Sequence, residues 1–290
     1  MLKRVAWATD EQYIEITDRR DAVQLTTTDD TGIGRMEVIP LQSGSNGNCI
    51  YIESRGVRLL LDAGISGQQA QLRLAAHGRD IKEVQGLIIS HEHRDHVCGM
   101  GVFHRKFGLP VYISEPTLRA ANPGDRLGRL SNIRHFRAGE VLRFEHITVE
   151  TIPTAHDAVD GVGFVIDDGT HRVGILTDLG HVFAGLQTIV QSLDAVMIES
   201  NYDTAMLDAG AYPRMLKHRI SGPGGHLSND DSAELLRAAG CRRLQWVCLA
   251  HLSAENNHPE LAAEAHRRLI GTQLPLTVAS RSGVSAVLRV

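Results

Sequence analysis

Hydrophobic and polar positions along the chain follow strand-like and helix-like spacings in two successive stretches. The first stretch predicts strands at 36–41, 49–53, 57–61, 84–89 and 111–114, and helices at 68–76 and 97–107. The second predicts strands at 147–152, 162–166, 172–177, 195–199 and 244–250, a last strand within 278–290, and helices at 182–192, after Ser228 and at 259–270. Strands interleaved with helices in both stretches predict one α/β domain whose helices cover its sheets.

The first 35 residues lack this pattern. They are polar and charged and allow only short strands at 12–16 and 22–26. We therefore expect residues 1–35 to be an N-terminal extension and residues 36–290 to form the domain.

Composition narrows the class of protein. The 290 residues are 42% hydrophobic and 22% charged, as in ordinary soluble globular proteins. A net charge of −4 excludes a generally basic nucleic-acid binder but allows a local basic patch. Aromatic residues at 4% argue against broad stacking platforms for single strands. No cysteine pair has C-x-x-C spacing, no apolar run is long enough to span a membrane, and the start resembles no signal peptide, so a cytoplasmic location is expected.

The segment 90–96, Ser-His-Glu-His-Arg-Asp-His, lies between a predicted buried strand and a predicted helix. His91 and His93 are two apart on an extended segment and can point at one ion, while Asp95 and His96 follow the turn and can point at a second. Imidazole and carboxylate suit zinc, manganese or iron, and the lack of nearby thiolates argues against a zinc finger. The alternative is a solvated polar loop.

Three more candidate ligands follow predicted strands elsewhere in the chain. They are His156, Asp178 and His251. The ends of strands are where α/β proteins gather their sites. Any one of these residues alone would more often belong to a turn or a cap, but together with the first segment they supply seven candidate ligands.

The order H-x-H-x-D-H, a later His, a later Asp and a late His resembles the metallo-β-lactamase superfamily. The resemblance implies an αββα sandwich, with two mixed β-sheets, helices on the outer faces and a binuclear site at one edge. It also implies two divalent metal ions, with zinc favoured and manganese or iron as alternatives. Carried over by motif, one ion has His91, His93 and His156, the other has Asp95, His96 and His251, Asp178 bridges them, and Asp62 supports the site.

Further motifs resemble the YycJ/WalJ branch of that superfamily. They are the loop at 43–49, Glu-Ser-Asn at 199–201, and the segments 212–220, 225–229 and 251–257. The branch is described as metallohydrolases, with 5′→3′ exonuclease activity on double-stranded DNA in some members. The family pattern starts close to Met36, so residues 1–35 have no counterpart in it.

The resemblance also points to a reaction. A two-metal site polarises a phosphoryl or carbonyl oxygen and lowers the pKa of a bridging water, which gives hydroxide at neutral pH. Asp95 and Asp178 would orient that hydroxide. His226, in a Gly-rich loop before a capped helix, is the candidate to assist the leaving oxygen, because a similar G-H-x-[ST] element occurs in transfer-RNA 3′-processing enzymes of the superfamily. The alternative is that His226 is a purely structural neighbour of the cap.

A cationic cluster precedes the same Gly-rich loop. Arg214, Lys217, His218 and Arg219 are candidate phosphate-binding residues, since Gly-rich backbone before a helix N-terminus also favours anions. The alternative is a solvated basic helix face. Asn201 could bond to substrate or to a ligand of the metal.

These observations favour a metal-dependent phosphodiesterase that acts on nucleic acid, specifically a DNA exonuclease. A small-molecule metallohydrolase of the same fold, acting on a lactone, a thioester or a cyclic phosphodiester, is the first alternative. A metal-bound regulatory protein with little turnover is the second, and an oxygen-using di-iron protein is a further one. Nucleic acid is the expected partner, no membrane association is expected, and no protein partner is predicted.

Overall fold

The computed structural model describes residues 35–290, so the predicted extension and its two short strands lie, apart from Arg35, outside the described residues. Two seven-stranded sheets form the centre, in the orders β14-β1-β2-β3-β4-β5-β6 and β13-β12-β11-β10-β9-β8-β7. The first sheet contains β1 (Glu37–Gln42), β2 (Cys49–Ser54), β3 (Val57–Leu61), β4 (Gly86–Ile88), β5 (Val111–Tyr112), β6 (Ile133–Arg134) and β14 (Leu288–Arg289). The second contains β7 (Val141–Phe144), β8 (Ile147–Pro153), β9 (Val162–Asp167), β10 (Arg172–Leu176), β11 (Ala195–Glu199), β12 (Val247–Ala250) and β13 (Leu276–Val278).

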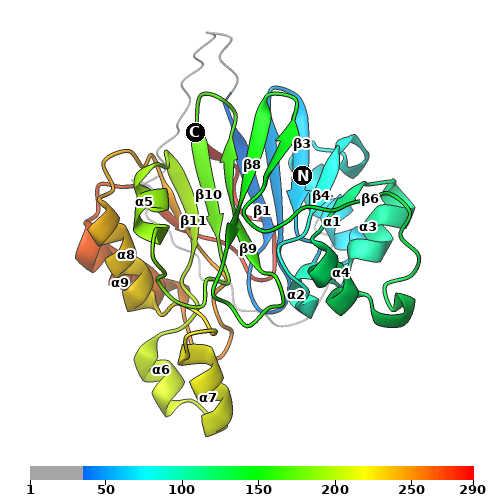
Figure 1. The fold of residues 1–290 in the computed structure, drawn as a ribbon. Helices are drawn as coiled ribbons and strands as arrows, with labels where there is room; N and C mark the ends of the chain where they lie inside the picture. Colours follow the sequence, from blue (N-terminus) through cyan, green and yellow to red (C-terminus); the bar gives the residue numbers. More distant parts are fainter. Residues whose placement is uncertain (1–34) are drawn as a thin grey trace, which may run out of the picture. The chain divides into compact units, whose positions relative to one another are not determined.

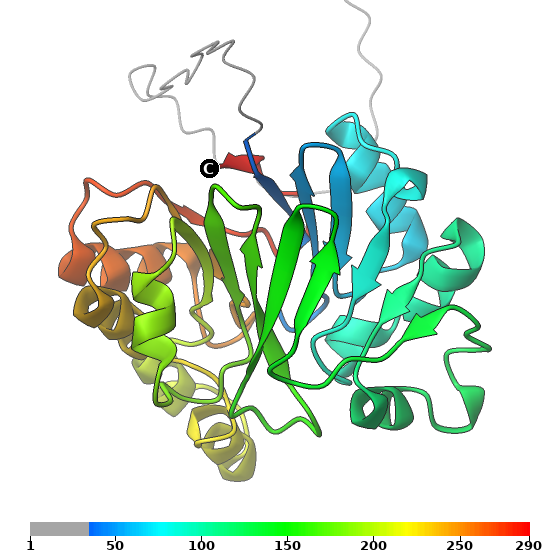
Figure 2. The ribbon, with the colours of Figure 1, turned by 45° about the horizontal axis from the view of Figure 1, so that its top comes forward.

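Helices lie on the outer side of each sheet (Figure 1 and Figure 2). The first sheet carries α1 (Gly67–Ala76), α3 (Met100–Phe107) and α4 (Glu115–Ala121), and the second carries α5 (Leu186–Gln191), α8 (Asn229–Ala239) and α9 (Pro259–Ile270). Three further helices lie at one end of the sandwich: α2 (Arg94–Val97), α6 (Thr204–Ala209) and α7 (Arg214–Ser221). The predicted αββα architecture is confirmed.

Both sheets are mixed, and in the same way. Strands β1 to β3 pair antiparallel and β3 to β6 pair parallel, while β7 to β10 pair antiparallel and β10 to β13 pair parallel. Parallel strands send their carboxyl ends to one edge of a sheet. The loops after β4, β10, β11 and β12 therefore all begin at the edge of their sheet where the parallel strands end. Most of the candidate ligands lie in these loops.

Strand periodicity builds three apolar layers. In β2, Ile50 and Ile52 face the core between the sheets, whereas Cys49 and Tyr51 face the helices that cover the first sheet. A third cluster packs α5, α8 and α9 against the second sheet. A strand buried on both faces needs apolar residues at every position, and this explains why the central strands appear in the sequence as nearly continuous apolar runs.

Several predicted elements differ from those observed. Within the predicted helix at 97–107, α2 ends at Val97 and α3 begins only at Met100. The break lies at Gly99, whose backbone N–H donates to Ala63 O at 2.7 Å and where a Cβ atom would lie 2.2 Å from Ile65 O. The predicted helix at 182–192 is confined to α5, and only β13 and β14 form near the predicted final strand. Helices α4 and α6 and strands β6 and β7 were not predicted, because elements this short depend on their neighbours more than on periodicity.

Among residues 35–290, no helix combines the length and the apolar composition that a bilayer crossing requires.

Candidate metal centre

The ligand-rich loop joins β4, inside the first sheet, to the short helix α2. His93 is the N-cap of α2, so His91 precedes the turn while Asp95 and His96 lie on the first turn of the helix. His91 and His96 are buried with their ring centroids 4.0 Å apart, and the side chain of His93 is 27% exposed. The tight turn thus points three imidazoles and a carboxylate toward one region.

Three ends of strands in the second sheet supply the remaining candidates: His156 after β8, Asp178 after β10 and His251 after β12. Asp178 and His251 have φ values of 55° and 54°, and Asp62, directly after β3, has a φ value of 62°. Non-glycine residues rarely adopt this left-handed conformation, and they keep it at functional sites where the surrounding structure holds them. The three residues with positive φ therefore lie just after buried strands, at two candidate ligands and at Asp62.

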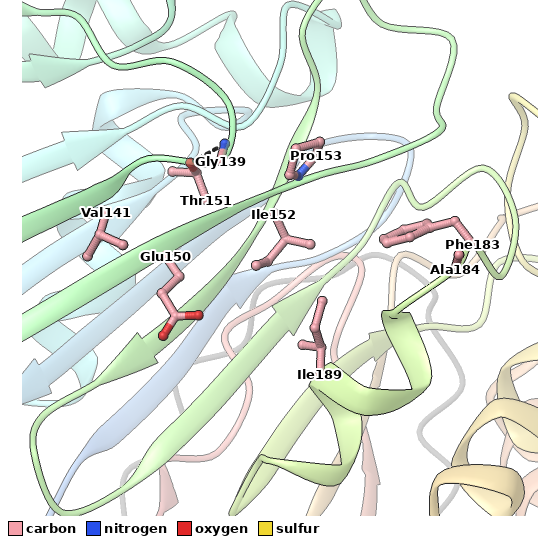
Figure 3. A pocket seen from close by; sticks show the side chains of 9 residues that line it. All are labelled: Gly139, Val141, Glu150, Thr151, Ile152, Pro153, Phe183, Ala184 and Ile189. Carbon is pink, nitrogen blue, oxygen red and sulfur yellow. Dashed lines mark hydrogen bonds between the residues drawn. The ribbon is translucent and has the colours of Figure 1, made fainter.

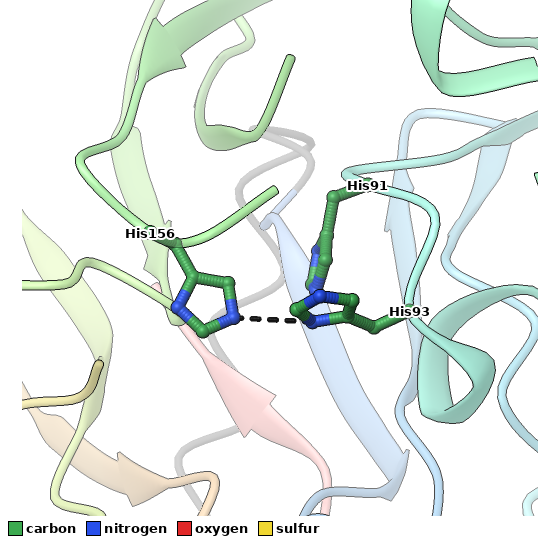
Figure 4. A group of neighbouring side chains, drawn as sticks. All are labelled: His91, His93 and His156. Atoms are coloured by element: carbon green, nitrogen blue, oxygen red, sulfur yellow. Dashed lines mark hydrogen bonds between the residues drawn. The ribbon is translucent and has the colours of Figure 1, made fainter. Parts of the chain in front are cut away.

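The first ligand group consists of His91, His93 and His156, which offer nitrogen atoms within 4.8 Å of one another. Figure 4 shows the three rings converging from two separate loops, with His156 Nε2 3.2 Å from His93 Nδ1. His156 Nδ1 donates to Gly225 O at 2.8 Å. Because that bond keeps the proton on Nδ1, the Nε2 lone pair of His156 faces the other two rings, as a metal ligand requires.

The second ligand group consists of Asp95, His96 and His251, whose ligand atoms also lie within 4.8 Å of one another. Asp95 Oδ2 is 3.5 Å from His96 Nε2 and 3.3 Å from His251 Nε2. On its far side, His96 Nδ1 donates to Asp62 Oδ2 at 2.7 Å. A carboxylate behind a histidine fixes the ring and raises its basicity, which is the supporting place that the motif suggested for Asp62.

Asp178 lies between the two groups. Its Oδ2 is 3.4 Å from His96 Nε2, and its Oδ1 is 3.7 Å from His156 Nε2 and 3.5 Å from His251 Nδ1. Among residues 35–290, Asp178 Oδ2 and His91 Nε2 are buried without a hydrogen-bond partner. Buried polar atoms of this kind need a partner, and lone pairs that converge from both groups fit divalent cations.

The charge balance of the protein without ions fits the same interpretation. Burial lowers the pKa of His96, but the carboxylates of Asp178, Asp62 and Asp95 outweigh it and raise the pKa well above its usual value. Burial acts likewise on His251, and Asp178 and the other carboxylates raise its pKa to about 10. Protons on these rings thus neutralise the carboxylates, and metal ions would displace them on binding.

Glu199 is a central residue that sequence reasoning noted only as part of a motif. It ends β11, is fully buried, and its Oε1 accepts from His226 Nδ1 at 2.6 Å. Its Oε2 accepts from the backbone N–H groups of Leu179 and Leu227. Burial raises the pKa of Glu199, but His226 and a bond to His251 lower it to about 2, so the carboxylate is charged. A glutamate at the end of an otherwise apolar buried strand was the available signal.

Asn48, in the predicted loop at 43–49, is a second such residue. Its Nδ2 lies 3.0 Å from His96 Nε2 and 3.4 Å from Asp95 Oδ2. No spacing rule in the sequence links this loop to residues 95 and 96, because the contact depends on the order of strands in the sheet, where β3 lies between β2 and β4.

His226 lies at the rim of the same centre. Its ring centroid is 4.8 Å from that of His156 and 5.2 Å from that of His251, and its side chain is 19% exposed. The preceding Gly225 is packed so closely that a Cβ atom would lie 2.0 Å from Ile220 O. The Gly-rich loop thus brings His226 in contact with the ligand residues while it remains reachable from outside.

The predicted cationic cluster forms the helix α7, which has no buried residue. Arg219 reaches the centre, because its Nε donates at 2.6 Å to Asp157 Oδ2, and Asp157 Oδ1 is 3.5 Å from His156 Nε2. Lys217 Nζ instead donates to Asp208 O, and Arg214 and His218 are exposed on the helix. Of the four cations, the structure brings only Arg219 next to the ligand groups.

Asn201 is buried behind the centre. Its Nδ2 donates to His251 O at 2.7 Å, and its own backbone O accepts from Ser253. With 3% of its surface exposed, Asn201 contacts the loop that carries His251. Of the two roles considered for Asn201, this geometry favours the support of a ligand over contact with substrate.

A cavity of about 440 Å³ lies on the outer face of the second sheet, between β8 and α5 (Figure 3). Its lining includes Ile152, Phe183 and Ile189, with Glu150 at its edge. The candidate ligands lie instead around the loops at the ends of the strands, and this apolar cavity contains none of them among its lining residues.

Comparison with known proteins agrees with this geometry. The sequence matches the model of the metallo-beta-lactamase superfamily over residues 43–237. Exodeoxyribonuclease WalJ of Streptococcus pneumoniae is 40% identical over 227 residues, which cover 77% of this chain and 83% of that protein. Exodeoxyribonuclease YycJ of Bacillus anthracis is 34% identical over 224 residues, which cover 77% and 84%.

The fold comparison extends over most of the described residues. The crystal structure of the metallo-beta-lactamase fold protein YhfI from Bacillus subtilis matches 88% of this chain and 100% of its own, with a TM-score of 0.68 and 16% identity. At that identity the likeness shows the fold alone. Because the sequence match spans most of the ligand segments and two relatives align over most of their own length, the chain belongs to the metallo-beta-lactamase superfamily, in the branch of WalJ and YycJ, and is a metal-dependent hydrolase.

Proposed function

We propose that this hydrolase is a phosphodiesterase that degrades double-stranded DNA as a 5′→3′ exonuclease. The observation that carries the proposal is the Glu199–His226 pair at the rim of the two ligand groups, with an arginine held beside the same rim. A phosphodiester needs an activated water, a group for the leaving oxygen and a cation for the phosphate, and residues of each type lie together here. The two relatives named exodeoxyribonucleases support DNA as the substrate.

The first ligand group would hold one divalent ion, the second group another, and Asp178 would contact both. A set rich in imidazole and without thiolate favours zinc, with manganese or iron as alternatives. When bound, such ions polarise the phosphoryl oxygen and lower the pKa of a water molecule toward neutrality. Asp62 and the backbone O of Gly225 would hold His96 and His156 in the tautomers that leave Nε2 available.

His226 would assist the leaving oxygen. Its Nδ1–H bonds to Glu199, which leaves Nε2 as the atom that can meet a substrate. With Nδ1–H held by Glu199, a proton carried on Nε2 would pass to the leaving oxygen as the phosphorus–oxygen bond breaks. Glu199 has no exposed surface and would act through His226, without contacting the substrate itself.

Arg219 would bind a non-bridging oxygen of the DNA backbone. Its side chain is 60% exposed and already points toward the ligand groups through Asp157. The other cations of α7 would contact phosphates further along the strand, because they lie on the same exposed helix. This separates a nuclease from a hydrolase of neutral lactones or thioesters, which needs no such cations.

The test replaces His226 with alanine and follows two substrates, 5′-labelled duplex DNA and bis(p-nitrophenyl) phosphate. We expect kcat to fall about 10²–10⁴-fold on both, since general acid assistance contributes that much, while the metal content stays unchanged. His171→Ala, in the hairpin between β9 and β10, is the control and should keep wild-type kcat.

Polarity is tested with the same duplex. Early release of a labelled nucleotide from the 5′ end, and late release from a 3′ label, is the expected result. If His226→Ala keeps wild-type kcat, or loses activity only because metal is lost, the assigned role is wrong. If wild-type protein cleaves the small diester but no DNA, a small-molecule metallohydrolase becomes the better assignment.

A further inference from the structure

A cavity of about 480 Å³ lies beside His226. Three segments that are distant in sequence form it: the turn after β10 with His181 and Val182, the end of β11 with Tyr202, and the loop before α8 with Pro223 and His226. A cavity of this size is within the range of small-molecule sites. Since His226 is part of its wall, a group bound here would lie next to the proposed leaving oxygen.

Tyr202 is the buried polar residue of this cavity. It is 5% exposed, and its hydroxyl has no hydrogen-bond partner among residues 35–290, whereas the hydroxyls of Tyr51 and Tyr112 both have one. Burial, with help from nearby carboxylates such as Asp231, raises the pKa of Tyr202 to about 12. The hydroxyl is therefore neutral at physiological pH and can both donate and accept. The hydroxyl is not one of the fully buried atoms without a partner, so it is accessible and free to bond to a group placed in the cavity.

Apart from His181 and His226, no side chain that lines the cavity can carry a positive charge. Its lining includes the carboxylate of Asp231 and no lysine or arginine. Asp231 Oδ2 accepts from Ser228 Oγ at 2.6 Å, which leaves Oδ1 to accept from a ligand. Val182, Pro223 and Leu227 add apolar surface. A flat, neutral ring with both N–H and C=O groups fits this lining better than an anion does.

A second crevice, of about 30 Å³, also has His226 in its lining, together with His156, Asp157 and Arg219, and it contains the arginine that would bind phosphate. His226 is thus shared by a small crevice that contains Arg219, paired with Asp157, and a larger cavity without lysine or arginine. A nucleotide presents the same pair of parts, an anionic phosphate and a neutral base.

We propose that the cavity lined by Tyr202, His181 and Asp231 binds the nucleobase next to the scissile phosphate, and that Tyr202 is a specificity-determining residue. This inference rests on the proposed function. In a thymine, the N3–H group would donate to Asp231 while a ring carbonyl accepts from the Tyr202 hydroxyl. A polar group built to meet a substrate group discriminates strongly against substrates that lack it.

The test compares two diesters: the dinucleotide pTpT, which has a thymidine on either side of its scissile phosphate, and bis(p-nitrophenyl) phosphate, which has no base. We expect Tyr202→Phe to lower kcat/KM for pTpT about tenfold, mainly through KM, because one hydrogen bond to the base is lost. Turnover of the diester without a base should stay at the wild-type value, which also shows that the variant is folded. Tyr112→Phe, with its hydroxyl bonded to Arg134 on β6, is the matched control and should change neither substrate.

A second variant fills the cavity from its rim. Val182 is 44% exposed, so Val182→Trp should be tolerated by the fold and should selectively lower kcat/KM for pTpT. Equal effects of Tyr202→Phe on both diesters, or no effect on either, would overturn the inference. If the wild-type protein hydrolyses neither diester, the proposed function fails, and calorimetry with thymidine still decides the cavity: binding that Tyr202→Phe weakens supports it, and no binding refutes it.

Discussion

At the scale of single residues, Asp178 connects the two ligand groups, whereas His93 belongs to one of them. We predict that Asp178→Ala weakens the binding of both metal ions, while His93→Ala weakens chiefly one. The physical reason is that Asp178 oxygens lie within 3.7 Å of His96, His156 and His251, so its loss leaves both groups without a shared carboxylate. Metal stoichiometry by elemental analysis measures the effect.

The control for this prediction is Asp167→Asn, since Asp167 pairs with Arg172 at the hairpin between β9 and β10. It should keep the wild-type metal content. An Asp178→Ala protein that retains both ions would show that Asp178 does not bridge the two groups.

The residue scale also shows what sequence can predict about this site. The seven candidate ligands were found because each follows an apolar strand or lies in one dense motif, and the structure brings all seven together. Asn48 and Glu199 were not identified as parts of the centre, because their contacts to His96 and His226 depend on tertiary packing. The roles of the ligands stay predictions until metal binding is measured.

At the scale of elements, α7 has no buried residue and carries four cationic side chains, of which Arg219 is tied to Asp157. We predict that the double variant Arg214→Gln/Lys217→Gln binds duplex DNA more weakly and with a flatter salt dependence. Each lost phosphate contact should reduce the slope of log K against log salt by about 0.9, because fewer counterions are released. Arg219 is left intact in this variant, since its bond to Asp157 ties it to the ligand groups.

Binding is measured by fluorescence anisotropy over a salt series, with Arg243→Gln/Arg268→Gln as a control of equal charge change. Those two arginines pair with Asp194 and Asp230, away from α7. Turnover of bis(p-nitrophenyl) phosphate should be unchanged in both proteins. A control that weakens DNA binding as much as the α7 variant would mean that only net charge matters.

The elements themselves were predictable to different degrees. The long central strands and the helices α1, α8 and α9 were predicted closely, because their periodicity reflects burial along one face or both. The two-residue strand β6 was not predicted, because it carries no period and exists only where β5 offers it hydrogen bonds. The break between α2 and α3 depends on a close approach to the turn after β3, which no local pattern encodes.

At the scale of the whole domain, the ligand groups join its two sheets. His91, His93, Asp95 and His96 come from the loop after β4 in the first sheet, whereas His156, Asp178 and His251 follow strands of the second. The three-histidine group thus spans both sheets, and so does the second group. Metal binding should therefore stabilise the packing of one sheet on the other, since a ligand that binds only the native state shifts folding toward it.

The last prediction concerns the start of the domain as a whole. A chain that begins at Met36 should fold, bind metal and unfold within about 3 °C of the full protein, a difference of roughly 1 kcal/mol or less. Met36 is fully buried and exchanges backbone hydrogen bonds with Val290, and β1 pairs with both β2 and β14. Every candidate ligand lies after it.

A chain that begins at Leu41 is the control and should fail to fold, because it loses Val38 and Ile39, each worth about 1.5–3 kcal/mol when buried, together with most of a strand. Calorimetry and metal analysis of both chains decide the matter: a Met36 chain that is insoluble or free of metal would show that residues 1–35 are an integral part of the domain.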